Sequence, residues 1–150
     1  MATITAVVGA RTALTTSALN SLASATYVSA GTVDLTATAP LDVLVDVAVT
    51  PGTVAGNKQL IVFAKVSLNG TDWTTGPETG STATDEPNLR FIGTVPCNTN
   101  ATQQRNMLSV VSALGFIPPH LEIVVKNETG AALAASGHSV HYALVTGNSA

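Results

Sequence analysis

Charged side chains are scarce in this sequence. Only 10% of its 150 residues are Asp, Glu, Lys or Arg, whereas 45% are hydrophobic. Globular chains ordinarily carry about 25% charged residues, and large exposed apolar patches usually mark places where another protein binds. We therefore expect this chain to be a subunit that lies against neighbouring subunits.

Cysteine and clustered basic residues are also lacking. Cys97 is the only cysteine, which excludes an internal disulfide and a structural zinc site built on paired thiolates. The net charge is −3, and the six Lys and Arg residues are scattered singly along the chain. A nucleic-acid-binding protein normally carries a basic stripe. We therefore expect no direct binding to nucleic acid.

Long hydrophobic runs are missing, since none approaches the roughly 20 residues that span a bilayer. Residues 1–10 lack a positively charged leader, so we expect neither a membrane protein nor a secreted precursor. Three tripeptides fit the glycosylation pattern, and they begin at Asn69, Asn100 and Asn127. Without a secretory signal we expect these tripeptides to be ordinary turn sequences.

Hydrophobic residues alternate with a period of two from residue 31 onward, which is typical of β-strands because successive side chains point to opposite faces. In residues 42–50 four β-branched side chains share one face: Val43, Val45, Val47 and Val49. Residues 58–68 are apolar on both faces in their first half, which predicts a central strand covered on both sides.

Further strands are predicted over residues 89–95, 105–113, 121–127 and 139–145. Short strands separated by Gly, Pro and Asn signals, without convincing helices between them, favour an all-β fold. We predict an antiparallel β-sandwich that is jelly-roll-like. Residues 31–150 are expected to form the sandwich domain, and residues 1–30 an N-terminal arm and lead-in strand.

An extended arm is predicted for residues 1–25. Their Ser and Thr residues compete for backbone hydrogen bonds and so weaken a helix there. A sandwich leaves strand edges that need cover, so the arm is expected to lie on a neighbouring subunit or on the sandwich. Its hydrophobic residues are predicted interface residues: Ile4, Val7, Val8 and Leu14.

Residues 74–87 have no periodicity and are rich in Thr, Gly, Glu and Asp, which predicts a long exposed loop and a second interface candidate. The acidic residues in and near it have irregular spacing: Asp72, Glu78, Asp85 and Glu86. Whether this loop is solvated or binds a divalent ion or a glycan stays open at this point.

Aromatic residues make up only 4% of the chain, and Trp73 is the single tryptophan. This residue directly precedes the predicted loop. It either packs at the edge of the core or offers a flat platform to a sugar or another partner. We include Trp73 among the predicted interface residues.

Patterns of catalytic residues are absent. His138 and His141 are three residues apart, so a regular strand places them on opposite faces and keeps them from sharing a metal ion. The run from Gly137 to His141 lacks the second glycine of a nucleophile elbow. We therefore predict a protein that is not an enzyme and has no catalytic residues, metal ligands or cofactor.

Several turn and strand segments follow one another in a distinctive order. In the first half they are residues 20–23 (NSLA), 41–43 (LDV) and 69–73 (NGTDW). In the second half they are residues 89–93 (LRFIG), 107–110 (MLSV), 114–119 (LGFIPP) and 123–140. Over roughly residues 19–145, the chain resembles small virion structural proteins of tailed double-stranded DNA bacteriophages.

This resemblance implies a virion component, of which a capsid cement (decoration) protein best fits the size and the lack of catalytic residues. The implied partners are the major capsid protein and further copies of the chain, with a trimer expected. The implied location is the capsid surface, after synthesis in the host cytoplasm. The alternative is a binding module on the tail or head surface that recognises a host glycan or receptor.

Overall fold

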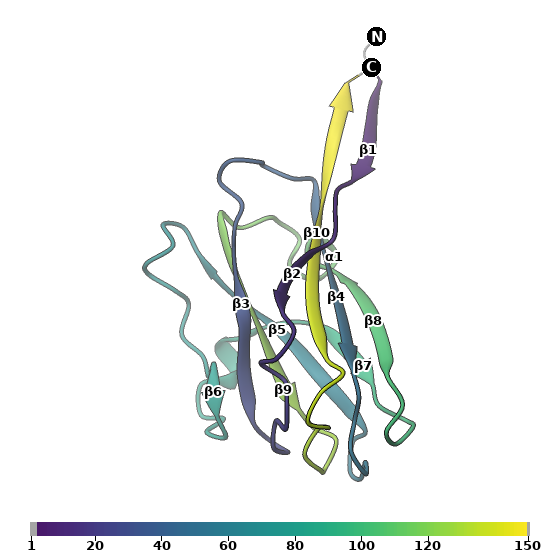
Figure 1. Cartoon of the computed structure of the whole chain (residues 1–150). Helices are drawn as coiled ribbons and strands as arrows, with labels where there is room; N and C mark the ends of the chain where they lie inside the picture. The colour runs from purple at the N-terminus through teal and green to yellow at the C-terminus, as the bar shows by residue number, and fades with distance from the viewer. Residues whose placement is uncertain (1–2, 150) are drawn as a thin grey trace.

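The structure, a computed structural model, describes residues 3–149 and consists of two antiparallel β-sheets packed together. One sheet contains β1 (Ile4–Val8), β2 (Thr12–Thr15), β4 (Asp42–Val49), β8 (Gln104–Ser109) and β10 (Ser139–Ser149). The other contains β3 (Tyr27–Asp34), β5 (Gln59–Ser67), β6 (Thr79–Gly80), β7 (Arg90–Pro96) and β9 (His120–Asn127). The predicted all-β antiparallel sandwich is confirmed (Figure 1).

Strand order follows from the register of the pairs. The first sheet has the order β1-β10-β4-β8, and β2 pairs with the same edge of β10 as β1 does. The second sheet has the order β6-β3-β9-β5-β7. The chain passes from one sheet to the other at most connections between successive strands, so residues far apart in sequence meet in one core.

The core consists of the side chains that alternate inward from both sheets. On β4 the predicted inward face is confirmed, because all four of its valines are fully buried: Val43, Val45, Val47 and Val49. From the opposite sheet, Leu121, Ile123 and Val125 of β9 are equally buried. Since β-branched side chains pack well on a pleated surface, this alternation holds the two sheets together.

Strand β5 is covered on both faces, as its sequence predicts. Leu60 and Val62 point into the core and are fully buried. Phe63, on the opposite face, is also buried and belongs to a second apolar cluster with Tyr27, Leu89 and Val124. The segment between β5 and β7 lies over this second cluster, which explains why Ile61 and Phe63 on the outer face of β5 are apolar.

The strand predicted over residues 105–113 is wrong in its second half. β8 ends at Ser109, and residues Val110–Leu114 form the short helix α1. The Ser109 hydroxyl accepts a hydrogen bond from the backbone N–H of Ser112, and Gly115 ends the helix with a φ of 77°. A serine N-cap and a left-handed glycine are strong helix-end signals, and here they outweigh the β-branched residues between them.

Most residues between β1 and β3 belong to the sandwich in the structure, whereas β1 pairs only with the end of β10; residues 1–2 of the predicted arm lie outside the described residues. β2 pairs with β10, and both Leu19 and Leu22 are part of the core. Of the two placements left open for the arm, residues 12–25 therefore lie on the chain's own sandwich. β3 itself begins at Tyr27 and crosses the predicted domain boundary at residue 31.

Two leucines at opposite ends of β5 test this burial pattern. Leu60 is fully buried, whereas Leu68, just past the strand, is 84% exposed. We expect Leu60→Ala to lower the free energy of unfolding by about 2–5 kcal/mol, because it leaves a cavity in the core. Leu68→Ala is expected to change it by no more than about 0.5 kcal/mol.

Urea unfolding at a constant m-value measures both changes. Equal losses for the two variants would contradict the described placement of β5.

Candidate functional site

One end of the sandwich collects the loops that carry its exposed apolar side chains. The register places the ends of β3, β5 and the start of β9 together, since Asp34 and Ser67 both pair with His120. In the other sheet, β4 starts here, and β8 ends beside it before α1. Residues 35–41, 68–73 and 115–119 connect these strands at the top of Figure 1. We call this region the loop end.

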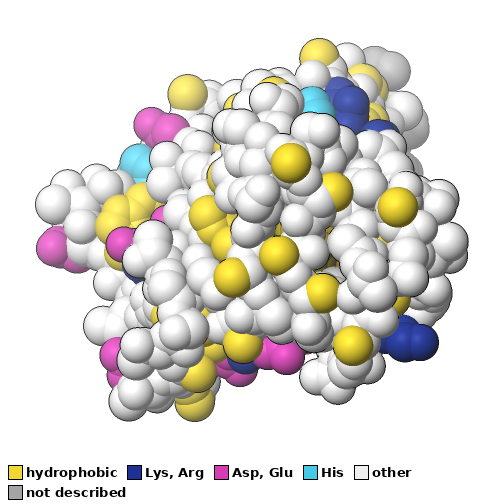
Figure 2. All heavy atoms as spheres, turned by 60° about the horizontal axis from the view of Figure 1, so that its bottom comes forward, with side chains coloured by type: hydrophobic (Ala, Val, Ile, Leu, Met, Phe, Trp, Pro, Cys, Tyr) yellow, Lys and Arg dark blue, Asp and Glu magenta, His cyan; other side chains and the backbone are white. Residues whose placement is uncertain are grey.

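Exposed large hydrophobic side chains gather at the loop end. Eight such side chains occur among the described residues, and six of them lie on its loops or on β1: Ile4, Val7, Val8, Leu41, Leu68 and Phe116. Figure 2 brings the opposite end forward, where the hydrophobic side chains are scattered and the charged ones lie mostly at the margins. The loop end and β1 therefore carry most of the exposed large hydrophobic side chains of the described residues.

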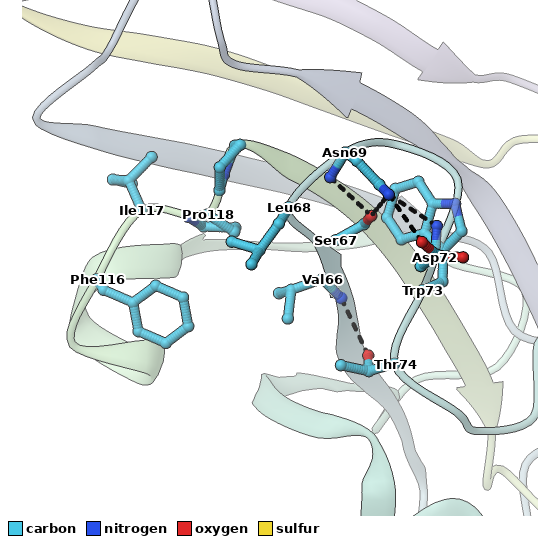
Figure 3. A pocket seen from close by; sticks show the side chains of 11 residues that line it. Val66, Ser67, Leu68, Asn69, Asp72, Trp73, Thr74, Phe116, Ile117 and Pro118 are labelled. Carbon is cyan, nitrogen blue, oxygen red and sulfur yellow. Dashed lines mark hydrogen bonds between the residues drawn. The ribbon is translucent and has the colours of Figure 1, made fainter.

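A cavity of about 580 Å³ opens at the loop end (Figure 3). Its walls come from the turn after β5 and from the segment that leads into β9. Most of the lining is apolar: Val66, Leu68, Trp73, Phe116, Ile117, Pro118 and Pro119. The polar lining residues are Ser67, Asn69, Asp72 and Thr74. We call this cavity the Trp73 pocket.

Polar groups in the wall of the Trp73 pocket are occupied by the turn itself. The Ser67 hydroxyl accepts hydrogen bonds from the N–H groups of Asn69 and Gly70. The Asn69 side-chain oxygen accepts from the N–H groups of Thr71 and Asp72, at 2.9 and 2.8 Å. Such Asx turns are favoured by Asn followed by Gly, and Gly70 has a φ of 74°. The remaining recognition surface is mainly apolar.

A second hollow continues this surface toward β4. It has a volume of about 420 Å³ and shares the segment 117–119 with the Trp73 pocket. The other lining residues come from the β3–β4 loop: Leu35, Thr36, Ala39 and Pro40. Leu41, the next residue, is 52% exposed and donates its N–H to the Val145 carbonyl of β10. The apolar surface thus runs from the Trp73 pocket to β10.

The structure places the predicted interface residues in three settings. Ile4, Val7 and Val8 lie exposed on β1. Trp73 is half-buried and lines the pocket. Leu14 instead packs against the core, next to the position that a Cβ on Gly31 would take. Leu14 is therefore less available to a partner than the three residues of β1.

Sequence reasoning missed Leu41, Leu68 and Phe116 as surface residues. Each follows or precedes a Pro or Gly turn signal at the end of a predicted strand. A large apolar residue next to such a turn has no guaranteed place in the core, and this position is the signal that could have found them.

Residues 74–87 are mostly exposed and mostly irregular, as the predicted long loop requires, but the segment is held against the sandwich. The segment crosses the outer face of the second sheet, where β6 pairs with β3, and includes the 3₁₀ helix η1 (Glu86–Asn88). Glu78 bonds to Lys65, and Glu86 bonds to both Lys126 and Tyr27. We call residues 74–89 the strap, because these contacts fasten the segment over the second apolar cluster.

The charges of the strap pair with the sheet below it. Burial opposes ionisation of Glu86, but hydrogen bonds from Lys126 and Tyr27 outweigh it and hold the pKa of this carboxyl below its ordinary value. Burial likewise disfavours the charged form of Lys126, yet bonds to Glu128 and Glu86 raise its pKa. Glu78 and Glu86 of the strap thus form ion pairs with lysines of the same chain. These pairs give no support to the hypothesis that the segment binds an ion.

Histidines are dispersed. His138 is buried just before β10, and its Nδ1 accepts a hydrogen bond from the N–H of Thr50. His120 lies 3.8 Å from the carboxylate of Asp34. Burial lowers the pKa of His141, and the nearby Arg11 lowers it further. Among residues 3–149 no three His, Cys, Asp or Glu side chains come together as a metal site.

The three glycosylation tripeptides take part in turns. The Asn69 and Asn100 side chains accept backbone hydrogen bonds, the latter from Val54. Asn127 is fully buried and donates to the carbonyls of Leu22 and Ala131. The tripeptides therefore serve as turn sequences, as predicted.

Cys97 is buried, and this burial raises the pKa of its thiol to about 11.

Comparisons with known proteins assign no relative. No protein-family model matches the chain, and no curated protein or solved structure matches it significantly. Within the described part of the chain, no helix has both the length and the apolar character needed to cross a membrane.

The fastening of the strap makes stability depend on pH. A carboxyl whose pKa is lower in the folded state stabilises the fold above its unfolded pKa, about 4.3 for Glu, and this contribution is lost as the pH falls through the folded value. We expect Glu86→Gln to be less stable at neutral pH and to lose less stability on acidification.

The urea midpoint between pH 7 and pH 3 measures this dependence. Asp85→Asn, at the exposed neighbouring position, serves as the control and should follow the parent curve. A parent-like acid profile for Glu86→Gln would show that the strap is not fastened by this carboxylate.

Proposed function

We propose that the protein is a capsid cement protein of a tailed bacteriophage, which binds the outside of the major capsid lattice as a homo-oligomer and stabilises it. The observation that carries this proposal is the gathering of exposed apolar side chains at the loop end. An apolar surface of this kind favours a protein partner. The sequence resemblance to virion structural proteins supports the choice of the capsid as that partner.

Topology supports the same proposal. Apart from β1 and β6, the strands divide into β2-β10-β4-β8 in one sheet and β3-β9-β5-β7 in the other. Their succession along the chain, with most connections crossing between the sheets, is the arrangement expected of a jelly roll, a fold that recurs in capsid proteins. Fold similarity alone does not define a function. The strand topology therefore only adds to the support that the apolar surface gives.

Binding through the loop end would stabilise a lattice by burying apolar area. Burial contributes about 25 cal/mol per Å², and stable protein interfaces bury at least about 1,000 Å². An oligomer that contacts several capsid subunits at once gains further through avidity. No reacting group is needed for this role, so the proposed protein is not an enzyme.

Two exposed hydrophobic residues test the site. Leu68 lines the Trp73 pocket, whereas Met107, 62% exposed, lies on β8. We expect Leu68→Lys to weaken binding to capsids stripped of this protein at least tenfold, because it places a charge in the apolar contact. Met107→Lys should bind like the parent protein.

Cosedimentation of each variant with the stripped capsids measures the binding. The capsids themselves should withstand heat and osmotic shock better once the parent protein is restored. If stripped and restored capsids are equally resistant, the cement role is excluded.

A second candidate is a module that binds a host glycan or receptor. The observation that favours it is the half-buried Trp73 beside Asp72, whose carboxylate accepts one bond, from the Asn69 amide. A tryptophan face next to a carboxylate is suited to a sugar. Against it, the other polar groups of the wall are largely engaged within the turn.

A glycan array separates the two candidates. Specific binding by the parent protein that is lost in Trp73→Ala, with Phe91→Ala as the control for an exposed aromatic residue elsewhere, would favour the receptor-binding function. We expect no specific glycan binding by the parent protein or by Trp73→Ala.

A further inference from the structure

The last part of β10 leaves the sandwich as a two-stranded ribbon. β10 pairs with β4 only as far as Val145, which is opposite Asp42. Beyond that point β10 pairs with β1 alone, from Val8 opposite Val145 to Ile4 opposite Ser149. Figure 1 shows this ribbon, β1 with the end of β10, projecting past the loop end. A lone two-stranded ribbon is at best marginally stable in water.

Both edges of the ribbon carry unpaired backbone groups. The Val145 carbonyl accepts from Leu41 on the β4 side, so the alternation of an antiparallel strand points the N–H of Gly147 to the same side, beyond the end of β4. The Leu144 carbonyl accepts from Gly9 on the β1 side, and the same alternation points the N–H of Ala6 away from β10. Among the described strands, none pairs with these two edges.

The two faces of the ribbon differ in polarity. Residues opposite each other in register share a face, and the described side chains of one face are apolar or absent: Ile4, Ala6, Val8, Val145 and Gly147. Leu41 joins this face, since its side chain and that of Ile4 lie within 3.5 Å of the position that a Cβ on Gly147 would take. We call it the apolar face of the ribbon. The opposite face is mostly polar: Thr5, Val7, Thr146 and Asn148.

Charges that would keep copies apart are missing from the ribbon. Residues 3–9 and 143–149 include no Asp, Glu, Lys or Arg. Proteins normally protect an exposed strand edge with a charge, a proline or a bulge, and the described ribbon has none of these. With Ile4 71% and Val8 60% exposed, the ribbon is suited to pairing with an identical uncharged ribbon.

We propose that three copies of the chain join through their ribbons, which close into a six-stranded antiparallel collar around a three-fold axis. In this collar, the free edge of β10 in one copy pairs with the free edge of β1 in the next. The two strands run in opposite directions in every copy, so all six pairings around the ring are antiparallel. Closure of the ring removes every open edge.

The side chains of the apolar face favour three copies over a larger ring. Ring closure places this face on the inside, where Ile4 and the pair of Val8 with Val145 form two hydrophobic layers. Between them lies the pair of Ala6 with Gly147, the smallest side chains of the ribbon. About eight strands already give an interior that side chains only just fill. Ala6 and Gly147 are too small to fill the middle layer of such an eight-stranded ring of four copies, so these side chains favour the narrower ring of six strands.

This inference rests on the oligomeric part of the proposed function and gives it a definite structure. The collar stands beside the loop end in each copy, so three Trp73 pockets would face the same way around one axis. That arrangement suits a single oligomer that contacts several capsid subunits at once.

Adjacent valines on β1 provide a matched pair of variants. Val8 lies on the apolar face and Val7 on the polar face, and both are exposed, at 60% and 42%. We expect the full-length parent protein to have a light-scattering mass three times its chain mass of 15.1 kDa. Val8→Lys should be a folded monomer, because three lysines would meet inside the collar. Val7→Lys should remain a trimer.

Amide hydrogen exchange provides a second measurement at the predicted contacts. In the parent protein the amides of Ala6 and Gly147 should exchange at least tenfold more slowly than in Val8→Lys, whereas core amides such as that of Val45 should not differ. Ile4→Lys, on the same face, should reproduce the effect and serves if Val8→Lys does not fold.

Three results would overturn the collar. They are a monomeric or dimeric parent protein, a Val8→Lys variant that is still a trimer, or Val7→Lys and Val8→Lys trimers that dissociate to the same extent. A trimer with these properties that fails to bind stripped capsids would instead refute the cement function and leave the collar intact.

Discussion

Burial of alternating aliphatic side chains between the two sheets is the interaction on which the rest of the structure depends. The valines of β4 meet Leu121, Ile123 and Val125 of β9 across the core. A shift of either strand by one residue would turn these side chains toward solvent, so core packing sets the register of both sheets. The same register decides where β4 begins, which loops meet at the loop end, and how far β10 extends beyond β4.

Two apolar surfaces lie outside this core, and the chain treats them differently. The cluster of Tyr27, Phe63, Leu89 and Val124 on the outer face of the second sheet is covered by the strap, whose glutamates pair with Lys65 and Lys126. No comparable segment covers the loop end or the ribbon among the described residues. The sparse charges thus secure one surface within the chain and leave another for partners. This contrast links the composition to an assembly role.

Strands were well predicted wherever one feature dominated the local sequence. The alternation in β4 and the doubly apolar run of β5 correspond directly to burial in the structure. The prediction failed where a few polar atoms decided the outcome, as at Ser109 and Gly115, whose capping converts the predicted strand end into α1. It was silent on which surfaces Leu14 and the strap would cover, because residues without a clear period have no local signal for the surface they lie on.

The sequence by itself determined the sandwich, its inward faces and the shortage of charged surface, because these follow from the spacing and type of neighbouring residues. Only the tertiary structure decided that residues 66–74 and 116–119 share a pocket, and that the two ends of the chain pair into a ribbon with one apolar face. Both arrangements depend on contacts between segments more than 40 residues apart in sequence. Such contacts are set by the packing of the whole core, which no local pattern encodes.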